Sequence, residues 1–375
     1  MRVMIAGGGT GGHVYPAVAI AEEIHKRMPD AEIAYVGTRR GLEARVLPSL
    51  PWVRFFSIRA RGFPRSIGWQ AIGFLCSLAV GCIQTISAFI RFRPNVVIGV
   101  GGYSSFVPVS VGAVLGRILP IRTLIHEQNA IPGLANRFLA RFVDDVLLSF
   151  PEAAQALPRT QRVIVTGNPV REEFTQACRS ESAYRLFGLD PSLRTVLVFG
   201  GSLGSTALVD GILQAKETLA GDGTLQVLMV TGDAADEHAI EMELAASSVH
   251  NVAIRRYIER MADAFSIADL IVSRAGATTL AEISACGKPA ILVPWRDASD
   301  DHQHANARAL EAVGGCAIAE EDEIAGTGLV DLIRDLVHDD ARLAHMAGNA
   351  AGFAPLDART RILGEIQWTA KEVRA

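Results

Sequence analysis

A glycine-rich loop near the start of the chain is the first place where residue types and spacing suggest chemistry. Residues 7–17 read GGGTGGHVYPA and follow a short apolar run, Val3–Ala6. A strand that passes through a glycine loop into a helix leaves backbone N–H groups at the positive end of that helix, where phosphate or a sugar diphosphate binds. His13 lies where the helix is expected to begin, near residues 13–16. The sequence therefore predicts an anion site with a titratable group beside it.

The same loop has the spacing of the dinucleotide fingerprint, with glycines at Gly7, Gly9 and Gly12. That fingerprint also needs an acidic residue at the end of the second strand, whose carboxylate binds a ribose. The second predicted strand instead ends in VGTRR (36–40), without a carboxylate. Arg39 or Arg40 could meet a 2′-phosphate, so an NADP-dependent oxidoreductase remains an alternative.

A stronger site signal lies in residues 269–294, DLIVSRAGATTLAEISACGKPAILVP. A predicted strand ends at Ser273, and a turn of small residues leads into a helix that starts at Thr278. The backbone donors and hydroxyls of that first turn suit a diphosphate. Glu282, one turn further on, could bind both hydroxyls of a ribose. The alternative is an ordinary glutamate that complements the helix dipole.

The polar loop that follows reads PWRDASDDHQHANA (294–307) and could suggest a metal site. Its acidic and imidazole side chains are Asp297, Asp300, Asp301, His302 and His304. The chain has no Asp-x-Asp triplet of the kind that metal-dependent sugar transferases use, so no metal is expected.

Two loops in the first half also follow predicted strands, GGYSS within 96–108 and HEQN within 124–136. The carboxyl ends of parallel strands share one edge of a sheet, so both loops should converge with the opening loop. Glycine lets a large ligand approach the backbone, and the HEQN side chains could hydrogen-bond sugar hydroxyls or an amide. A buried structural network of polar groups would have the same composition.

These loops need parallel sheets to position them, and the chain supplies near-continuous Val/Ile/Leu runs typical of parallel strands buried on both faces. The predicted strands are Val3–Ala6, Ile33–Val36, Val96–Val100, Thr123–His126 and Val146–Ser149, then Thr195–Phe199, Gln226–Val230, Asn251–Arg255, Leu270–Ser273 and Ala290–Val293. Helical runs such as Ala17–Arg27 and Pro132–Arg141 alternate with them. RTVLVFGGSLGS (194–205) repeats the strand, glycine loop and helix start of the opening segment.

We therefore expect an α/β protein with two doubly wound Rossmann-like domains facing a central cleft. The N-terminal domain should cover 1–165 and the C-terminal domain 166–355. An amphipathic helix over 356–375 should pack back on the first domain.

The composition limits the class of protein. A chain of 375 residues suffices for two domains, and a net charge of −4 does not suggest a nucleic-acid partner. Five cysteines without a CxxC pair indicate reduced thiols and no zinc site. The chain opens with a strand rather than a charged and then apolar leader, so no signal peptide is expected.

The segment Ser66–Ile90 contains no charged residue and lies between Arg65 and Arg91. Three readings stay open: a membrane-spanning helix, helices packed in a domain core, or an exposed apolar face that rests on a membrane between flanking arginines. Its apolar residues recur at helical spacing on one face, at Ile72, Leu75, Ala79, Ile83, Ile86 and Ile90, with Phe74, Leu78 and Phe89 off that stripe.

Taken together, the motifs resemble those of the bacterial MurG-type transferase family. GGTGGHVYPA, GGYSSFVP, HEQNAIPGLAN, GNPVR, GGSLGS and SRAGATTLAE followed by DHQHAN occur in that family's order and spacing, over essentially the whole chain. The resemblance implies the glycosyltransferase B fold. It implies inverting transfer of N-acetylglucosamine from UDP-N-acetylglucosamine to the 4-hydroxyl of lipid-linked undecaprenyl-diphosphate-N-acetylmuramoyl-pentapeptide (lipid I to lipid II), without a cofactor or metal.

The resemblance also implies a location and partners. The enzyme should lie peripherally on the cytoplasmic face of the bacterial inner membrane, with the Ser66–Ile90 region as its apolar patch. The expected partners are the donor, the lipid-linked acceptor, the membrane surface, and proteins of cell-wall synthesis or division.

By the same resemblance, the donor binds mainly in the second domain. Ser202 and the helix start at Thr278 would contact the diphosphate, Glu282 the ribose, the backbone of Ile258 the uracil, and Gln303 the sugar. The full expected donor set is Thr10, Gly11, Gly12, Asn129, Arg171, Ser202, Ile258, Ala277, Thr278, Thr279, Leu280, Glu282 and Gln303. The acceptor side would include the opening loop together with Gly102, Tyr103, Ser104, Glu127 and Gln128. Some relatives carry two adjacent glutamines where this chain has DHQHAN, which leaves the role of His304 open.

His13 is the candidate catalytic base. A helix N-terminus disfavours its cationic form, so the imidazole should stay neutral and able to accept a proton near pH 7. A role in shaping the loop or binding the acceptor phosphate is the alternative. A non-catalytic membrane partner that binds nucleotide sugars would need the Glu282 helix but not His13.

Overall fold

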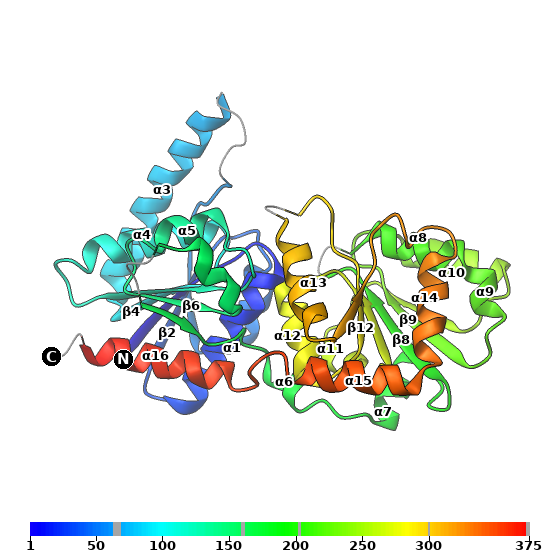
Figure 1. The fold of residues 1–375 in the computed structure, drawn as a ribbon. Helices are drawn as coiled ribbons and strands as arrows, with labels where there is room; N and C mark the ends of the chain where they lie inside the picture. The colour runs from blue at the N-terminus through cyan, green and yellow to red at the C-terminus, as the bar shows by residue number, and fades with distance from the viewer. Residues whose placement is uncertain (63–68, 159–161, 202–203, 299–300, 373–375) are drawn as a thin grey trace. The chain divides into compact units, whose positions relative to one another are not determined.

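The computed structural model describes residues 1–62, 69–158, 162–201, 204–298 and 301–372. The chain divides into two compact units, unit 1 with residues 1–171 and 355–375 and unit 2 with residues 172–354 (Figure 1). The division follows Arg171, a few residues after the boundary expected from the sequence.

In the part of unit 1 that the structure describes, seven parallel strands form one sheet in the order β3-β2-β1-β4-β5-β6-β7. They are β1 (Arg2–Ala6), β2 (Glu32–Gly37), β3 (Val53–Ser57), β4 (Val96–Gly99), β5 (Arg122–Glu127), β6 (Asp145–Leu148) and β7 (Arg162–Val165). The helices are α1 (Gly11–Arg27), α2 (Glu43–Val46), α3 (Trp69–Phe92), α4 (Tyr103–Leu115), α5 (Leu134–Leu139) and α16 (Ala358–Glu372), with short 3₁₀ turns at Leu47–Ser49 and Pro151–Ala156.

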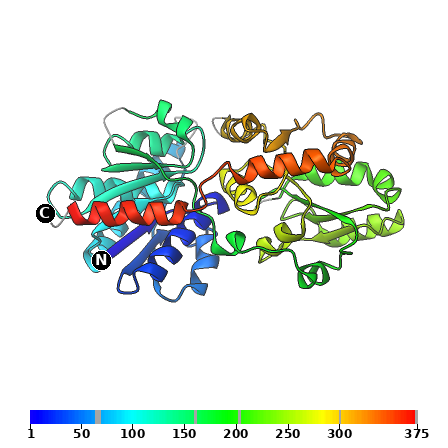
Figure 2. The ribbon, with the colours of Figure 1, turned by 60° about the horizontal axis from the view of Figure 1, so that its bottom comes forward.

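The C-terminal helix α16 belongs to unit 1 and lies beside α1 (Figure 2). Ile362, Leu363 and Ile366 are buried in the same apolar cluster as Ile20 of α1. Thr369 Oγ1 donates a 2.8 Å hydrogen bond to Asp145 Oδ2 at the start of β6. The tail therefore supplies part of the core of unit 1.

In unit 2, the six strands that the structure describes are also parallel, in the order β10-β9-β8-β11-β12-β13. They are β8 (Arg194–Phe199), β9 (Leu225–Val230), β10 (Val252–Arg255), β11 (Leu270–Ser273), β12 (Ala290–Leu292) and β13 (Cys316–Ile318). The helices are α6 (Glu172–Thr175), α7 (Glu181–Phe187), α8 (Thr206–Gln214), α9 (Lys216–Ala220), α10 (Glu237–Ala246), α11 (Met261–Ile267), α12 (Ala277–Cys286), α13 (His302–Ala312), α14 (Gly328–Val337) and α15 (Asp340–Ala351).

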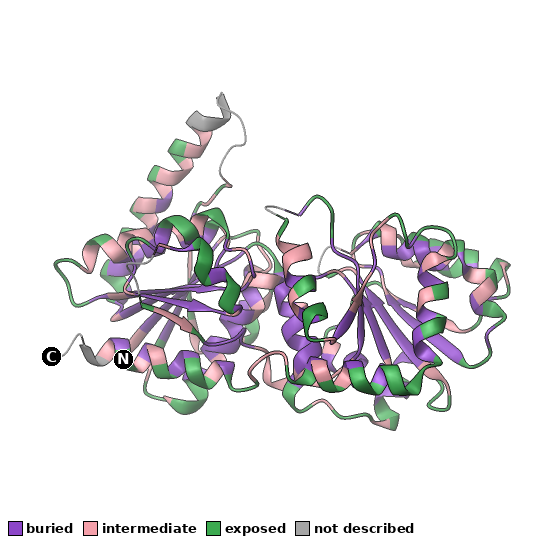
Figure 3. Ribbon diagram, viewed as in Figure 1, coloured by how far each residue is buried: buried purple, intermediate pink, exposed green. Residues whose placement is uncertain are grey.

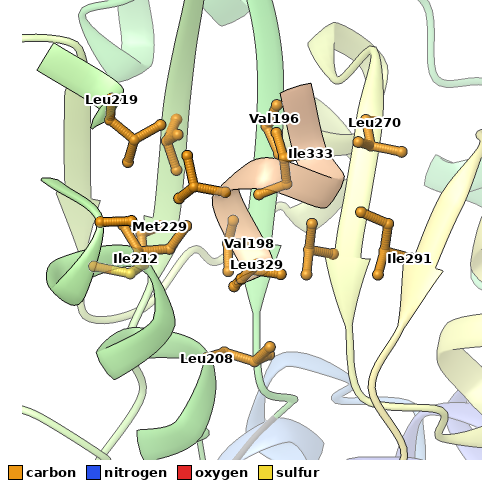
Figure 4. Packing of buried hydrophobic residues seen from close by; sticks show 14 of the residues in the cluster. Val196, Val198, Leu208, Ile212, Leu219, Met229, Leu270, Ile291, Leu329 and Ile333 are labelled. Atoms are coloured by element: carbon orange, nitrogen blue, oxygen red, sulfur yellow. The ribbon is translucent and has the colours of Figure 1, made fainter. Parts of the chain in front are cut away.

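The central strands of both sheets are buried on both faces, as Figure 3 shows. In unit 2, Val196, Val198 and Met229 of the sheet pack with Leu329 and Ile333 of α14 in one cluster (Figure 4). Burial of such side chains contributes about 1.5–3 kcal/mol each, which explains why these runs form the strands. The fold class expected from the sequence is confirmed.

Each sheet reverses its strand order at one point, between β1 and β4 in unit 1 and between β8 and β11 in unit 2. Ligands of doubly wound sheets bind beyond the carboxyl ends of the strands at such a point. The GGGTGG and GGYSS loops follow β1 and β4, whereas GGSLGS and SRAGATT follow β8 and β11. The four most distinctive motifs therefore flank the two reversal points.

The structure corrects the sequence prediction at the sheet edges. Strands β3, β7 and β13 were not predicted, and all three are edge strands. Arg54 and the exposed Phe55 interrupt the apolar pattern of β3, whereas β7 and β13 are short runs of four and three residues. Helix α1 also begins at Gly11, before the predicted start near His13.

Helix α3 carries the described part of the uncharged segment, and most of its residues from Gly73 onward are exposed or half-buried. Among the described residues, Gly73–Phe92 is long and apolar enough to cross a membrane, with 22% of its most apolar window buried. Phe89 and Phe92, in its last turn, pack into the core of unit 1. The predicted apolar stripe instead faces outward at Leu75, Ile83, Ile86 and Ile90. A helix buried throughout in a domain core is therefore ruled out for the described part of this segment.

Candidate active site

The opening loop of unit 1 lies over a buried carboxylate. Gly9 N donates to Glu43 Oε2 at 3.2 Å, and Thr38 donates to Glu43 Oε1 from its backbone N at 2.7 Å and from Oγ1 at 2.9 Å. The Glu43 side chain is fully buried. Sequence reasoning missed this residue, because Glu43 follows the strand end in a turn that folds back under the loop. The sequence signal that could have identified Glu43 is its position just after the loop GTRRG (37–41), which follows the strand next to β1.

The loop after β4 packs directly on the opening loop. Gly101 and Gly102 have φ of +88° and +76°, where side chains are disfavoured. A Cβ on Gly102 would collide with the carbonyl oxygen of Gly8, and one on Gly101 would lie 2.6 Å from His13 Nδ1. These two glycines therefore let the predicted loops meet at the ring of His13.

The His13 ring is connected to the HEQN loop. His13 Nδ1 lies 3.2 Å from Gln128 Oε1, and Gln128 Nε2 lies 2.9 Å from His126 Nδ1 and 3.0 Å from His126 O. His126 Nε2 lies 2.9 Å from Gly167 O. Gln128 and His126 are both buried, and burial lowers the pKa of His126 to about 4. The expected acceptor-side Gln128 thus contacts the expected base.

Glu127 organises its own loop. Its carboxylate accepts hydrogen bonds from Asn129 N (2.9 Å), Asn129 Nδ2 (3.2 Å), Gly133 N (3.1 Å) and Asn136 Nδ2 (2.8 Å). Glu127 and Asn136 are buried, whereas Asn129 is half-buried. These hydrogen bonds favour a positioning role for Glu127, which holds Asn129 in place through the backbone and side chain of that residue.

The remaining unit 1 candidates lie near the start of α1. Thr10 is the exposed N-cap residue of α1, and Gly11 and Gly12 form its first turn. The guanidinium carbon of Arg171 lies 4.3 Å from the ring centroid of Tyr15, two residues beyond His13. On the α4 side, Tyr103 is largely exposed and Ser104 is buried.

In unit 2, the loop after β11 enters α12 with Gly276 as N-cap. Ala277, Thr278 and Leu280 are buried in the first turn of α12, with half-buried Thr279 beside them. Glu282 is 8% exposed and lies beyond that first turn. The helix dipole acts chiefly within the first turn, so the alternative of a glutamate that merely complements the dipole is weakened.

The loop between β12 and α13 is tied to the loop after β11. Arg274 Nη1 donates to Val293 O at 3.2 Å and Pro294 O at 3.3 Å, and its Nη2 pairs with Glu321 Oε1 at 2.5 Å. Asn306 Nδ2 donates to Ala275 O at 3.1 Å. Sequence reasoning missed Arg274 and Asn306 as bracing residues, although both lie inside motifs that it singled out.

Gln303 accepts a 2.9 Å hydrogen bond from Trp295 N through its Oε1. Its Nε2 is thus the end that can donate to a sugar oxygen. Ile258 is buried in the loop after β10, at the same carboxyl edge of the sheet. Ser202 lies outside the described residues.

Both ring nitrogens of His304 contact carboxylates of the protein itself. Its Nδ1 lies 2.5 Å from Asp301 Oδ1 and its Nε2 lies 3.2 Å from Glu320 Oε2. Its burial lowers the pKa of His304, but hydrogen bonds from its ring to Glu320 and Asp301 outweigh this and raise it overall. Within the described part of the chain, which excludes residues 299–300 of this loop, no three His, Cys, Asp or Glu side chains gather as a metal site.

Comparison with known proteins agrees with this arrangement. The chain matches the glycosyltransferase family 28 N-terminal domain over residues 3–148 and the family 28 C-terminal domain over residues 195–362. A protein of Desulfitobacterium hafniense (strain Y51) is 38% identical over 97% of this chain and 98% of its own length. A protein of Desulforudis audaxviator (strain MP104C) is 40% identical over 92% of both chains.

Both relatives bear the name UDP-N-acetylglucosamine--N-acetylmuramyl-(pentapeptide) pyrophosphoryl-undecaprenol N-acetylglucosamine transferase. The crystal structure of Acinetobacter baumannii MurG matches 98% of this chain and 99% of its own, with a TM-score of 0.74 and 28% identity. With its two parallel-sheet α/β units of the glycosyltransferase B type, the chain belongs to glycosyltransferase family 28 and, within it, to the MurG-type transferases.

Proposed function

We propose that this protein transfers N-acetylglucosamine from UDP-N-acetylglucosamine to the 4-hydroxyl of undecaprenyl-diphosphate-N-acetylmuramoyl-pentapeptide, with inversion at the anomeric carbon. The observation that carries the proposal is near-full-length identity of 38% to a curated transferase of that name. The glycine loops at both strand-order reversals agree with it, since a diphosphate occurs in both substrates.

We propose that the donor binds at the carboxyl edge of the sheet in unit 2. The first turn of α12 would bind the diphosphate through Thr278 and Thr279, and Glu282 would bind the ribose hydroxyls. Gln303 supports a sugar contact, because its Oε1 is already fixed by Trp295 N and its Nε2 can donate. A helix N-terminus supplies fixed positive potential for the departing diphosphate, a role that a metal ion fills elsewhere.

We propose that the loops of unit 1 receive the acceptor and that His13 takes the proton of its hydroxyl. His13 is near the N-terminus of α1, which disfavours the imidazolium before reaction. Its ring is held by Gly101 on one side and Gln128 on another. The buried Glu43 already accepts from Gly9 N, so the acceptor diphosphate would use other donors of the loop.

The exposed face of α3 is proposed to rest on the membrane surface. Because the last turn of α3 packs into the core of unit 1, a peripheral position is favoured over a spanning one. Further exposed apolar side chains lie on or near α4 and α5, and Arg59, Arg61, Arg91 and Arg93 are exposed nearby in sequence. We propose the cytoplasmic face of the inner membrane as the location, with cell-wall synthesis and division proteins as further partners.

The test is transfer of labelled N-acetylglucosamine from UDP-N-acetylglucosamine to a lipid-diphosphate N-acetylmuramoyl acceptor. A product with inverted anomeric configuration and one UDP released per transfer is expected. Donor binding without transfer would instead favour the alternative of a non-catalytic membrane partner that binds nucleotide sugars. Calorimetric titration tests the oxidoreductase alternative. The proposed transferase should release or absorb heat on binding UDP, whereas an NADP-dependent oxidoreductase should do so only on binding NADPH.

A further inference from the structure

Two backbone carbonyl oxygens determine the direction of the hydrogen bonds behind His13. A carbonyl oxygen only accepts, so His126 Nε2, which lies 2.9 Å from Gly167 O, must carry a hydrogen. His126 is fully buried and its pKa is lowered to about 4, so its ring is neutral at pH 7. A neutral imidazole has one N–H, and His126 Nδ1 is therefore an acceptor.

The same reasoning fixes the amide of Gln128. One end of that amide faces His126 O at 3.0 Å and His126 Nδ1 at 2.9 Å, and both atoms are acceptors. That end must be the NH₂ group, so the other end, 3.2 Å from His13 Nδ1, is the carbonyl oxygen. His13 Nδ1 must donate to it. The neutral His13 ring consequently has its lone pair on Nε2.

We propose that Gln128 and His126 are positioning residues that hold His13 as its Nδ1–H tautomer, so that Nε2 is the atom that accepts the proton of the attacking hydroxyl. The proposal rests on the proposed function of His13 as the base. In the step, the O–H bond breaks and an N–H bond forms at Nε2. The hydroxyl oxygen bonds to the anomeric carbon, and the electron pair of the broken carbon–oxygen bond leaves with UDP.

The packing around His13 accommodates this hydrogen bond. A Cβ on Gly101 would lie 2.6 Å from His13 Nδ1 and 3.1 Å from Gln128 Oε1, so glycine leaves room for this hydrogen bond. Gln128 is 1% exposed, which shields the bond from water. Which imidazole nitrogen carries hydrogen is set by the bond that the other nitrogen makes. In water, neutral imidazole favours Nε2–H, so the structure imposes the less common tautomer.

The test is ¹⁵N NMR of the full chain labelled at histidine, at a pH where His13 is neutral. The His13→Asn variant identifies the His13 signals by their loss. In the unaltered protein, Nε2 should have the chemical shift of a lone-pair nitrogen and Nδ1 that of an N–H. An Nε2–H signal for His13 would overturn the proposal, and this signal is measured in the unaltered protein.

Gln128→Met is the matching variant, since methionine keeps the length and removes both hydrogen-bonding ends. We expect His13 to shift toward Nε2–H, and kcat to fall about 10-fold or more with little change in the donor KM. The control is Gln226→Met, which removes a buried glutamine bonded to Asp190 and Thr195 in unit 2 and should leave the tautomer and kcat unchanged.

An unchanged His13 tautomer in Gln128→Met would contradict the proposal. Failure of the proposed function appears differently. If His13→Asn retained normal turnover, His13 would not be the base, whichever tautomer the spectra report. If His13→Asn lost turnover while the unaltered protein showed Nε2–H, only the positioning proposal would fail.

Discussion

The backbone N–H of Gly9 donates to the carboxylate of Glu43 at 3.2 Å, so the chain itself supplies an anion beneath the opening glycine loop. A dinucleotide bound at the fingerprint would bring its diphosphate to this loop. In the fingerprint the backbone of the second glycine, here Gly9, approaches the diphosphate, and the N–H of Gly9 is already bonded to Glu43. The relationship therefore weakens the NADP alternative, as the missing ribose-binding acid does.

Glu43→Gln should loosen the loop. An amide has one accepting oxygen where the carboxylate has two, so either Gly9 N or the Thr38 donors lose a partner inside the protein. We expect the free energy of unfolding to fall by about 1–3 kcal/mol, measured by urea denaturation. The acceptor KM should also rise more than the donor KM. The control is Glu32→Gln, an exposed glutamate on β2, and equal stability of the two variants would refute the bracing role of Glu43.

Much of the fold could be predicted because its central strands are uninterrupted apolar runs. Strands such as Val196–Phe199 and Ile271–Ser273 are buried on both faces, so pattern and structure coincide. Among the edge strands that were not predicted, β3 is interrupted by Arg54, and β7 and β13 are only four and three residues long. The Ser66–Ile90 segment stayed ambiguous because an apolar stripe looks the same whether it faces a core or a membrane.

The candidate site was predicted at the level of loops but not of contacts. Strand-end motifs identify which loops converge, since the sheet dictates that. The hydrogen bond from His13 to Gln128 joins residues more than a hundred positions apart, and no local pattern encodes its direction. The bond from Gly9 to Glu43 likewise depends on a turn folding back after β2. Such contacts follow from the tertiary fold.

Glu282→Ala should weaken donor binding. Loss of two ribose hydrogen bonds at a buried carboxylate should raise the donor KM by a factor that corresponds to about 1–3 kcal/mol, with kcat less affected. Steady-state kinetics with varied UDP-N-acetylglucosamine measures this. The control is Glu181→Ala, at the start of α7 in the same unit, whose side chain is 85% exposed. An unchanged donor KM in Glu282→Ala would remove Glu282 from the ribose site.

His13→Ala should reduce turnover by about 100-fold or more while donor binding stays nearly intact, because a general base contributes that much. Rapid-quench transfer assays and calorimetric titration with UDP separate the two effects. The control is His25→Ala on the same helix, where the ring stacks on Trp52 at 4.2 Å. His25→Ala should keep full turnover, and normal turnover in His13→Ala would exclude the base role.

The exposed face of α3 should determine membrane binding. Ile83 and Ile90 are 69% and 68% exposed, and burying each in a membrane is worth roughly 1.5–3 kcal/mol. The change of either to Gln should therefore weaken binding to anionic vesicles by about 10-fold or more, measured by co-sedimentation. Leu186→Gln, an exposed leucine of α7, is the control. Vesicle binding that survives the double variant Ile83→Gln and Ile90→Gln would place the membrane contact elsewhere.

The buried ring of His126 should make unit 1 sensitive to acid. Its pKa is about 4 in the folded state against about 6.5 when unfolded, because burial disfavours the charged ring. The unfolded chain therefore binds a proton first as pH falls. The stabilising contribution is fully present above pH 6.5 and is lost between pH 6.5 and about 4, for a total of ~3 kcal/mol.

Urea denaturation across this pH range measures the effect, and the variant Trp295→Phe provides the reporter. The other tryptophans are Trp52, Trp69 and Trp368, which all belong to unit 1, so their fluorescence follows that unit alone. In this background, His126→Asn should be less stable at pH 7 and lose less stability on acidification. The pKa of His304 is raised, so its contribution to the free energy of unfolding is present below pH 6.5 and is lost only as pH rises above that value. His304 therefore does not contribute to the loss of stability in acid. Equal losses of stability in His126→Asn and in the Trp295→Phe parent between pH 6.5 and 4 would contradict this role of His126. The acid sensitivity of unit 1 would then come from another group.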